Sequence, residues 1–255
     1  MSKLHLSASQ LKTGDSCKRL HWFQKVGCLS SSKSKAGAER GKKLHTKMEE
    51  YLKTQPINPE ETILEFIERG EGVDKDLKHG LRSASFNPEI IALRNLAHTP
   101  NSGLHFLIEQ EFLLNRVFLG FIDLVVIDLR GDKPCIEIRD HKFTASPRYI
   151  PTEEDARLDP QAIVYPKAIM EYFNLESISF VYDFYGTKYK WYKQVKINLT
   201  KDEIEDTWLD VVEKSKVLLD NYLVPNASLV TPNYLSCGRF GGCEFKDLCF
   251  GGNSK

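Results

Sequence analysis

Hydrophobic positions recur with a helical period over the first hundred residues of the chain. Ser7, with a glutamine three residues later, has the spacing of a capping box, so a helix is expected to begin there and run toward Phe23. A polar stretch at 30–37 predicts a loop. Further helices are predicted at 38–52, 60–69 and 87–98. Residues 1–100 are therefore expected to form a helical N-terminal part.

From residue 101 onward the pattern changes to runs rich in β-branched and aromatic residues. Strands are predicted at 104–114, 117–129, 135–143, 177–185 and 189–197. A short turn between the second and the third indicates that the first three form an antiparallel meander. A proline after Asp159 and a capping box at Thr200 open two further helices. We therefore expect an α/β core over 101–222 and a loop-rich tail over 223–255.

The third predicted strand carries a charged pair where an apolar face ends. Side chains two positions apart on a strand share a face, and four such positions here are Ile136, Ile138, Asp140 and Lys142. Asp140 and Lys142 follow directly after the isoleucines. They form either a partly buried ion pair or an active site at the rim of a sheet.

Asp123 interrupts an apolar run on the preceding predicted strand. Val125 and Ile127 on the same face are apolar, so a carboxylate there has to pair with a cation, accept hydrogen bonds or bind a metal. The short turn brings Asp123 beside Asp140. Two carboxylates with a nearby lysine suit a Mg²⁺ or Mn²⁺ site for phosphoryl chemistry, in which Lys142 stabilises developing negative charge. An internal ion pair between Asp140 and Lys142 is the alternative.

Composition narrows the class of protein without identifying it. The 255 residues are 41% hydrophobic and 27% charged, which is ordinary for a soluble globular protein. No apolar run approaches the ~20 residues of a membrane span, and the N-terminus lacks the apolar segment of a secretory signal, so we expect a cytoplasmic protein with no membrane partner. Formal net charge is zero, but residues 18–47 hold nine Lys or Arg against one acid. That segment is either a footprint for phosphates or a solvated helix face.

The cysteines are concentrated near the C-terminal end of the sequence, which suggests a shared role. Half of the six fall near the C-terminus, at Cys237, Cys243 and Cys249. In a cytoplasmic protein such a cluster favours metal binding over disulfides. Cys28 and Cys135 are expected to be buried structural thiols.

Residues 182–192 lie in an aromatic, lysine-rich pair of predicted strands. Such side chains can stack single-stranded bases. Alternation along a strand instead predicts core on one face and ordinary surface on the other. The second role is the expected one.

Four short motifs occur in a fixed order along the chain. GKKLH ends at His45, GFID ends at Asp123, DHK spans Asp140–Lys142 and QAIVY spans Gln161–Tyr165. This order resembles the RecB-like branch of the PD-(D/E)xK nucleases, which have a helix histidine, a G-x-x-D strand, a (D/E)-x-K strand and a Q-x-x-x-Y helix. The resemblance covers most of the chain. It implies a restriction-endonuclease-like α/β core with a mixed central sheet flanked by helices, in a single nuclease domain over 1–255.

The same resemblance implies a role for each motif residue. A Mg²⁺ or Mn²⁺ ion would be held by His45, Asp123, Asp140 and the backbone carbonyl of His141. Lys142 would orient the attacking water and stabilise the transition state. Glu111, on the strand before Asp123, is a second candidate ligand for a further metal.

Gln161 and Tyr165 complete the implied catalytic set. They lie one turn apart on one helix face and would position the lysine or the DNA backbone. Pro166 follows directly, and a proline inside a helix usually kinks it. The shared face therefore depends on the kink falling after Tyr165.

A subset of this family carries a four-cysteine iron–sulfur cluster, including the CRISPR-associated Cas-four exonucleases and AddB-type nuclease domains. The resemblance assigns a 4Fe-4S cluster here to Cys17, Cys237, Cys243 and Cys249. The family commonly shows C-x2-C-x5-C, whereas this chain has C-x5-C-x5-C, so a Zn²⁺ site stays open as the alternative. The cluster would clip together distant parts of the chain, contributing roughly 5 kcal/mol of loop-closure entropy, and could hold the N-terminal helix over the active site.

Taken together, the resemblance implies a metal-dependent exonuclease acting on single-stranded DNA, with 5′ to 3′ polarity favoured, in recombination, repair or CRISPR adaptation. One alternative is a structure-specific endonuclease of the same family. Another is a non-catalytic DNA-binding module with a four-cysteine zinc site, against which the complete set of motif residues argues. The chain holds no helicase motif, so a helicase, recombination or CRISPR partner would be a separate protein.

Overall fold

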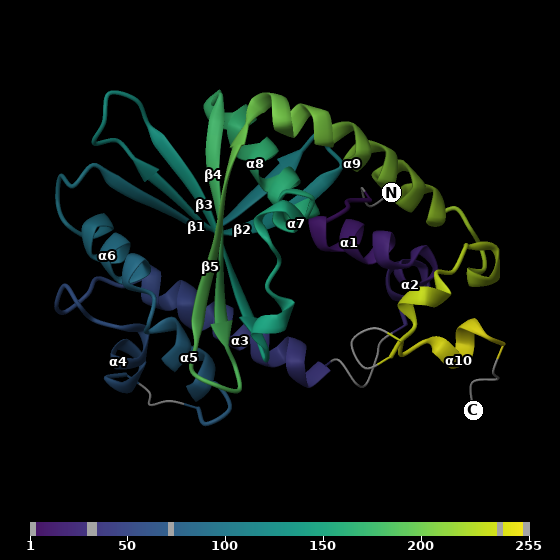
Figure 1. Cartoon of the computed structure of the whole chain (residues 1–255), viewed down its shortest axis with the longest axis horizontal. Helices are drawn as coiled ribbons and strands as arrows, with labels where there is room; N and C mark the ends of the chain where they lie inside the picture. The colour runs from purple at the N-terminus through teal and green to yellow at the C-terminus, as the bar shows by residue number, and fades with distance from the viewer. Residues whose placement is uncertain (1–3, 30–34, 71–73, 239–241, 252–255) are drawn as a thin grey trace.

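The computed structural model describes residues 4–29, 35–70, 74–238 and 242–251. Its centre is a sheet in the order β1-β2-β3-β4-β5 (Figure 1). The strands are β1 (Leu104–Leu114), β2 (Phe118–Asp128), β3 (Cys135–Thr144), β4 (Ser177–Gly186) and β5 (Tyr192–Thr200). Neighbouring strands are antiparallel except β3 and β4, which run parallel. The mixed sheet and its three-strand meander confirm the predicted fold class.

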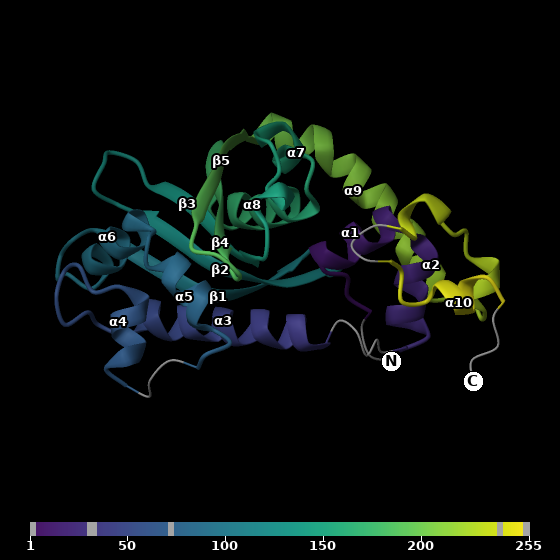
Figure 2. The same cartoon turned by 60° about the horizontal axis from the view of Figure 1, so that its bottom comes forward.

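Helices cover both faces of this sheet. They are α1 (Ala8–Ser16), α2 (Lys18–His21), α3 (Lys35–Lys53), α4 (Ile63–Glu68), α5 (Lys78–Ala84), α6 (Pro88–Ala97), α7 (Glu153–Arg157), α8 (Pro160–Phe173), α9 (Lys201–Asn221) and α10 (Lys246–Cys249). Shorter turns are the π-helical η1 (Trp22–Val26) and the 3₁₀ segments η2 (Pro147–Tyr149), η3 (Ala227–Leu229) and η4 (Tyr234–Ser236). Figure 2 shows α3 on one side of the sheet and α8 on the other.

Two apolar clusters form the core, one on each face. Ile136 and Ile138 of β3 belong to the cluster that contains the buried side chains of α1, α8 and α9. Leu124 and Val126 of β2 belong to the second cluster, with α3 to α6. Successive side chains of β2, such as Val125 and Val126, are therefore buried against opposite helical layers, as strand alternation requires. None of the described helices is long and apolar enough to cross a membrane.

Several predicted boundaries were wrong for local reasons. The first helix is interrupted at Cys17, whose backbone is extended at φ −163° and ψ 114°. Of the predicted loop at 30–37, residues 30–34 lie outside the described part, and the remainder already belongs to α3. Helix α4 begins after Thr62, because Thr62 and Glu65 form a capping box. Three short helices, α5, α7 and α10, were not predicted.

The β4–β5 hairpin is longer at its tip than predicted, since β5 begins at Tyr192. Gly186 is required there, because a Cβ on it would lie 2.2 Å from the carbonyl oxygen of Tyr189. Tyr182 and Tyr185 are buried, whereas Tyr189 is 73% exposed. The expected division into core on one face and surface on the other holds for β5, whose burial alternates, but was wrong for β4, which is buried on both faces because helices cover both sides of the sheet.

Two cysteines are placed differently from the prediction. Cys28 and Cys135 are exposed instead of buried. Cys135 is the first residue of β3, where the strand leaves the turn. Cys28 follows the end of η1 with a φ of 50°. Both positions lie at the ends of elements, where an alternating pattern gives no burial signal.

Candidate metal centre and cysteine lobe

The sheet forks where two of the predicted acids lie. Pairing between β2 and β3 runs from Asp128 with Cys135 to Leu124 with Arg139 and ends there. Beyond that point β2 continues beside β1, and β3 continues beside β4. Asp123 and Asp140 are the first residues past the last pair. The fork therefore places both carboxylates at the point where two strands separate.

Asp123 connects the separated strands and helix α3. Its Oδ2 accepts a 2.7 Å hydrogen bond from the backbone N–H of His141. His45 Nδ1, on α3, lies 3.4 Å from the same oxygen. Burial raises the pKa of Asp123 well above its ordinary value, and the charge of Asp140 adds to this while Lys142 opposes it. A bound cation would relieve this cost by favouring the ionised carboxylate.

Glu109 of β1 is an acid that the sequence did not single out. In the β1–β2 register it stands opposite Asp123, where the strand pairing is interrupted, and its φ is 50°. A left-handed backbone is costly for a residue with a Cβ and often marks a functional site. His45, Glu109 and Asp123 each offer a ligand atom within 4.8 Å of the others.

Burial raises the pKa of Glu109, and the neighbouring charge of Glu49 raises it further. The sequence candidate, Glu111, is exposed and lines a separate groove between β1 and α8. Counting back from the β1–β2 turn to the residue opposite Asp123 would have selected Glu109 in place of Glu111.

Asp140 and Lys142 form the ion pair that was the alternative interpretation of their spacing. Lys142 Nζ lies 2.5 Å from Asp140 Oδ2. Burial alone would lower the pKa of Lys142, but the charges of Asp140 and Asp123 outweigh it and raise the pKa. Lys142 therefore stays protonated next to two acids, Asp140 and Asp123, whereas a simple ion pair would involve Asp140 alone.

Helix α8 supplies the remaining predicted residues. The amide Nε2 of Gln161 donates to Asp140 Oδ1 at 3.2 Å and to the Tyr165 hydroxyl at 3.1 Å. Helix α8 runs unbroken through Pro166, so the shared face of Gln161 and Tyr165 is preserved. Burial raises the pKa of Tyr165 to about 12, so its hydroxyl stays protonated at neutral pH.

His141 presents its backbone, not its ring, to Asp123. The imidazole is buried, with Nδ1 3.3 Å from the Tyr185 hydroxyl and 3.7 Å from Asp183 Oδ2. Burial lowers the pKa of His141 well below its ordinary value, and the neighbouring His45 lowers it further. The neutral ring anchors β3 to β4, while its main chain lies at the fork.

The donors at the fork fit a divalent cation. Carboxylate oxygens are the preferred ligands of Mg²⁺, Ca²⁺ and Mn²⁺, and one imidazole is compatible with Mn²⁺. Burial lowers the pKa of His45, which keeps this imidazole neutral and able to ligate at neutral pH. The charge of Asp140 contributes to the raised pKa of both Glu109 and Asp123. The arrangement can therefore take up a metal beside a protonated lysine.

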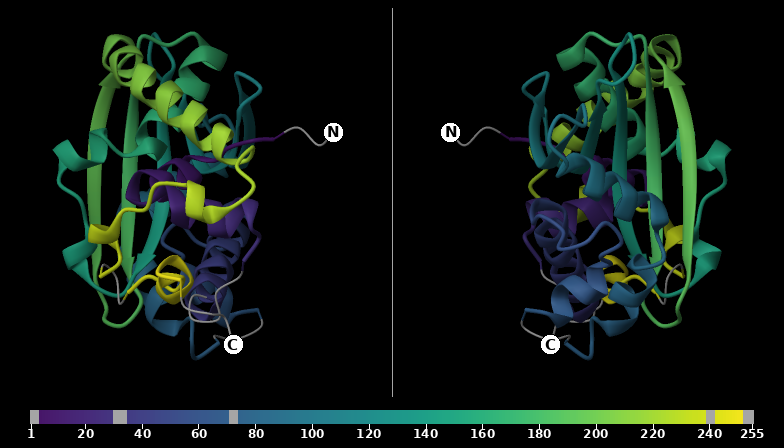
Figure 3. Two further views of the ribbon diagram at one scale, coloured as in Figure 1. Left: turned by 90° about the vertical axis from the view of Figure 1, so that its right-hand side faces the viewer. Right: turned by 90° about the vertical axis from the view of Figure 1, so that its left-hand side faces the viewer.

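A second group of candidate ligands lies in the cysteine lobe, which we define as residues 17–28, 225–238 and 242–251. Figure 3 shows these N-terminal and C-terminal segments side by side. Cys17, Cys237 and Cys243 line a cavity of about 190 Å³. Burial raises the pKa of the Cys243 thiol, and Cys237, Cys17 and Cys249 raise it further. The fold therefore brings together all four cysteines that the sequence singled out.

Their spacing bears on which metal fits. Four thiolates at ~2.3 Å from one tetrahedral Zn²⁺ lie roughly 3.8 Å apart. Across the described ranges, no three of these sulfurs lie within 4.8 Å of one another. The four thiols therefore lie near one another without the close spacing of a bound Zn²⁺.

Hydrogen bonds hold the lobe together around these sulfurs. Arg19 donates to the carbonyls of Val230 at 2.8 Å and Ser228 at 3.2 Å. Its Nη1 also lies 3.4 Å from Cys249 Sγ. The backbone N–H of Asn233 lies 3.3 Å from the sulfur of Cys17. These contacts fix the positions of two of the four sulfurs relative to the C-terminal segment.

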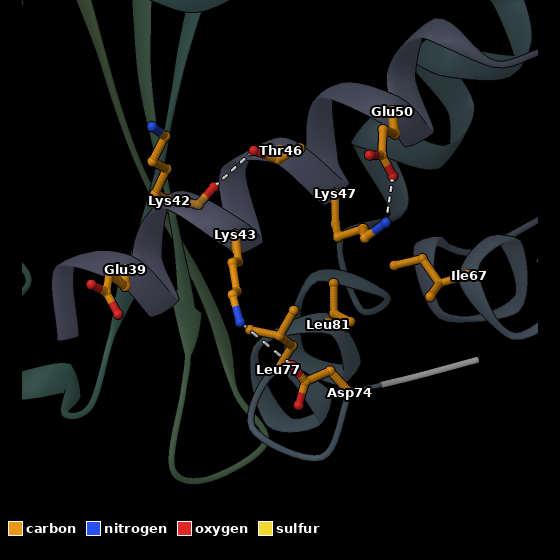
Figure 4. A pocket seen from close by; sticks show the side chains of 10 residues that line it. All are labelled: Glu39, Lys42, Lys43, Thr46, Lys47, Glu50, Ile67, Asp74, Leu77 and Leu81. Carbon is orange, nitrogen blue, oxygen red and sulfur yellow. Dashed lines mark hydrogen bonds and ion pairs between the residues drawn. The ribbon is translucent and has the colours of Figure 1, made fainter. Parts of the chain in front are cut away.

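A more voluminous hollow lies elsewhere, where α3 faces α4 and α5. Its volume is about 860 Å³ and none of the candidate metal ligands is among its lining residues. Figure 4 shows Lys43 directed toward Asp74 and Lys47 toward Glu50. Acids thus balance the lysines of the basic segment here, so this hollow is not an anion site. That part of the segment is a solvated helix face.

Comparisons with known proteins were made for the whole chain. No curated protein matches it. A crystal structure described as that of SSO0001 is 16% identical, covers 83% of this chain and 96% of the other, and has a TM-score of 0.32. The family described as "PD-(D/E)XK nuclease superfamily" matches residues 5–250. Because that match takes in the sheet fork together with both cysteine-bearing segments, the chain belongs to the PD-(D/E)xK nuclease superfamily.

Proposed function

We propose that the chain is a metal-dependent deoxyribonuclease that cuts single-stranded DNA at the sheet fork. Family membership supports metal-dependent nuclease activity in general. The observation that carries the assignment to these residues is the convergence of His45, Glu109 and Asp123 within 4.8 Å, next to the Asp140–Lys142 pair.

Each residue at the fork has a role in the proposal. His45, Asp123, Asp140 and the backbone carbonyl of His141 hold Mg²⁺ or Mn²⁺, and Glu109 is an additional ligand that the geometry supports. When bound, the ion polarises the scissile phosphate and makes water more acidic.

Lys142 carries a positive charge beside the ligands, because Asp140 and Asp123 raise its pKa. It therefore stabilises negative charge that develops on the phosphate in the transition state, and orients the attacking water. Gln161 fixes Asp140 by a hydrogen bond and is itself held by Tyr165. These two residues act by positioning the acid and the lysine.

The cysteine lobe is proposed to hold a 4Fe-4S cluster on Cys17, Cys237, Cys243 and Cys249. The support is the convergence of the four thiols and a cavity of about 190 Å³ lined by three of them. The cluster's role would be structural, tying α2 to the C-terminal segment.

The proposed mode of cutting rests only on the resemblance of the motifs to those of the RecB-like nucleases. We propose exonuclease action with 5′ to 3′ polarity, in the cytoplasm, in recombination, repair or CRISPR adaptation. A helicase or other partner protein would supply unwound DNA, because single strands have to be available to the fork.

The test is digestion of end-labelled single-stranded DNA with Mn²⁺, by the wild type and by Lys142→Ala. The proposal predicts release of labelled products by the wild type, removed by EDTA, and a loss of about 10²- to 10³-fold or more in Lys142→Ala. Labels placed on the 5′ or the 3′ end then report polarity. Equal degradation by both proteins would reject the catalytic assignment.

The cluster has a separate test in anaerobically purified protein. A brown preparation with broad visible absorption and iron bound to the four cysteines is expected. Stoichiometric zinc without iron would establish the alternative four-cysteine site.

A further inference from the structure

Two basic and aromatic segments that are far apart in sequence meet at the tip of the β4–β5 hairpin, beside α5 (Figure 1). Five of their residues, which we call the hairpin patch, are Arg82, Phe86, Lys188, Tyr189 and Lys190. All five are exposed, Tyr189 at 73% and Phe86 at 47%. Neither residues 78–86 nor residues 187–193 contain an acid. The patch therefore combines three positively charged side chains with two exposed rings.

The tip of the hairpin is held in place by α5 and β3. Ser83 Oγ donates to the carbonyl of Gly186 at 2.8 Å and accepts from the N–H of Trp191 at 3.3 Å. The N–H of Thr187 donates to the carbonyl of Thr144 at 2.9 Å. Because the hairpin tip is held in place by these hydrogen bonds, little backbone entropy would be lost when a ligand binds to it.

The two rings within the patch are not equivalent. Lys190 Nζ lies 3.7 Å from the centre of the Phe86 ring, so the lysine occupies one face of that ring and is fixed by it. Tyr189 is the more exposed of the two rings. Its backbone is held, because its carbonyl lies 3.4 Å from Ser83 Oγ. Tyr189 is thus the ring better placed to receive a flat ligand.

The patch adjoins the proposed active centre. Thr144, two residues beyond Lys142, pairs with Gly186 at the base of the hairpin tip. Strands rise about 3.3 Å per residue and lie about 4.8 Å apart, so the patch begins roughly 10–15 Å from Lys142. Helix α5 also packs at Gly80 against Leu44, the neighbour of His45. A strand leaving the fork can therefore reach the patch within a few nucleotides.

We propose that the hairpin patch binds single-stranded DNA beside the metal centre, with a base stacked on Tyr189 and phosphates neutralised by Lys188, Lys190 and Arg82. This rests on the proposed function in taking DNA as the substrate. Unpaired bases expose their faces, whereas bases in a duplex are already stacked, so a ring such as Tyr189 selects single strands. The cations alone would bind any polyanion.

The first experiment measures binding of fluorescent single-stranded DNA by anisotropy, without divalent metal so that no cleavage occurs. Tyr189→Ala should weaken binding about 5- to 100-fold, the range found for loss of one stacked base. Tyr189→Phe should restore it, because the ring is retained. Tyr172→Ala is the matched control, since Tyr172 is 80% exposed on α8 away from the hairpin, and it should bind like the wild type.

The second experiment separates stacking from charge. Lys188→Gln with Lys190→Gln should reduce the salt dependence of binding by about 0.7 in log–log slope for each phosphate that is no longer neutralised, while the exposed Lys216→Gln on α9 should not. Tyr189→Ala should leave duplex binding unchanged. Equal weakening for single-stranded and duplex DNA, or binding of a poly-glutamate peptide as tight as that of DNA, would overturn the proposal.

Failure of the patch and failure of the nuclease assignment have different signatures. If the wild type cuts DNA and Tyr189→Ala binds like Tyr172→Ala, the patch is wrong and the nuclease stands. If the wild type binds single strands through Tyr189 but cuts nothing, the patch stands and the nuclease assignment fails. In the expected case Tyr189→Ala raises KM with kcat unchanged.

Discussion

The metal centre and the cysteine lobe are two candidate metal sites built in opposite ways. At the fork, the donors stand on long strands and helices between two apolar clusters. In the lobe, the buried core consists of Phe23, Ala227 and Phe245 with partly buried neighbours. The lobe is otherwise held by side-chain to backbone bonds such as those of Arg19 and Trp22.

This contrast indicates how the free energy of metal binding is used at each site. The fork is positioned by the fold, so a metal binding there gains from donors already in place and need not organise the chain. The lobe has a small buried core, so the proposed cluster would add to its folding free energy. Removing the metal should therefore inactivate the first site and unfold the second.

The largest effect that we expect comes from replacing a metal ligand at the fork, which should abolish catalysis without unfolding the protein. Asp123→Asn should reduce cleavage about 10³-fold or more, because it removes an anionic ligand and the partner of His45. The thermal midpoint without metal should stay the same or rise, since burial disfavours the charge of Asp123. Calorimetry would check this, and a large drop in the midpoint would show that the fork depends on Asp123 for its fold.

The reverse pattern is expected for the lobe. If the lobe holds the proposed cluster, Cys249→Ser should abolish its visible absorption and make the C-terminal segment sensitive to limited proteolysis, because roughly 5 kcal/mol of loop closure is removed. Residual cleavage should persist at the fork. Cys135→Ser is the control, since Cys135 is exposed on the sheet. Unchanged proteolysis, absorption and stability in Cys249→Ser would remove the distinction between the two sites.

A matched pair of glutamates tests which acid of β1 belongs to the fork. Glu109→Gln should weaken Mn²⁺ binding about tenfold, because Glu109 offers a ligand atom near those of His45 and Asp123. Glu111→Gln, two residues along the same strand and exposed, should have no effect. Isothermal titration with Mn²⁺ measures both. Equal effects would mean that the acids of β1 act through general charge alone.

A smaller effect is expected in how the stability of the protein, with and without Mn²⁺, depends on pH. The folded pKa of Asp123 lies above its unfolded value, so its contribution to stability is full below the unfolded pKa and is lost as pH rises through the folded pKa. Mn²⁺ replaces the proton, so the thermal shift produced by Mn²⁺ should grow as pH rises through that window. Asp123→Asn should flatten this growth. A shift independent of pH in the wild type would contradict the assigned protonation.

The pattern of apolar residues along the chain predicted the strands of the sheet, because successive side chains of a strand point to opposite faces. The shared face of Ile136 and Ile138, the meander and the proline-capped α8 all follow from local chemistry. The position of the fork does not, because it depends on where β2 and β3 stop pairing. That end point is a tertiary property, and it is what separates Asp140 from an ordinary strand residue.

The candidate site shows the same limit. The motif order brought His45, Asp123 and Lys142 forward, but it missed Glu109, since its selection needs the β1–β2 register. The break of the first helix at Cys17 was also missed, because an extended residue within an apolar periodic segment has no local signal. Residues of this kind can be identified only from the three-dimensional structure, in which segments far apart in sequence lie next to one another.

A catalytic metal at the fork, bound beside Lys142, is the feature on which the proposed function depends. It is tested by comparing Mn²⁺ binding and cleavage of labelled single-stranded DNA in the wild type and in Lys142→Met, which keeps an unbranched side chain of nearly the same length but removes its charge. We expect Lys142→Met to bind Mn²⁺ still and to cut about 10²- to 10³-fold or more slowly. Cleavage at the wild-type rate by Lys142→Met, or cleavage by the wild type in EDTA, would contradict this assignment.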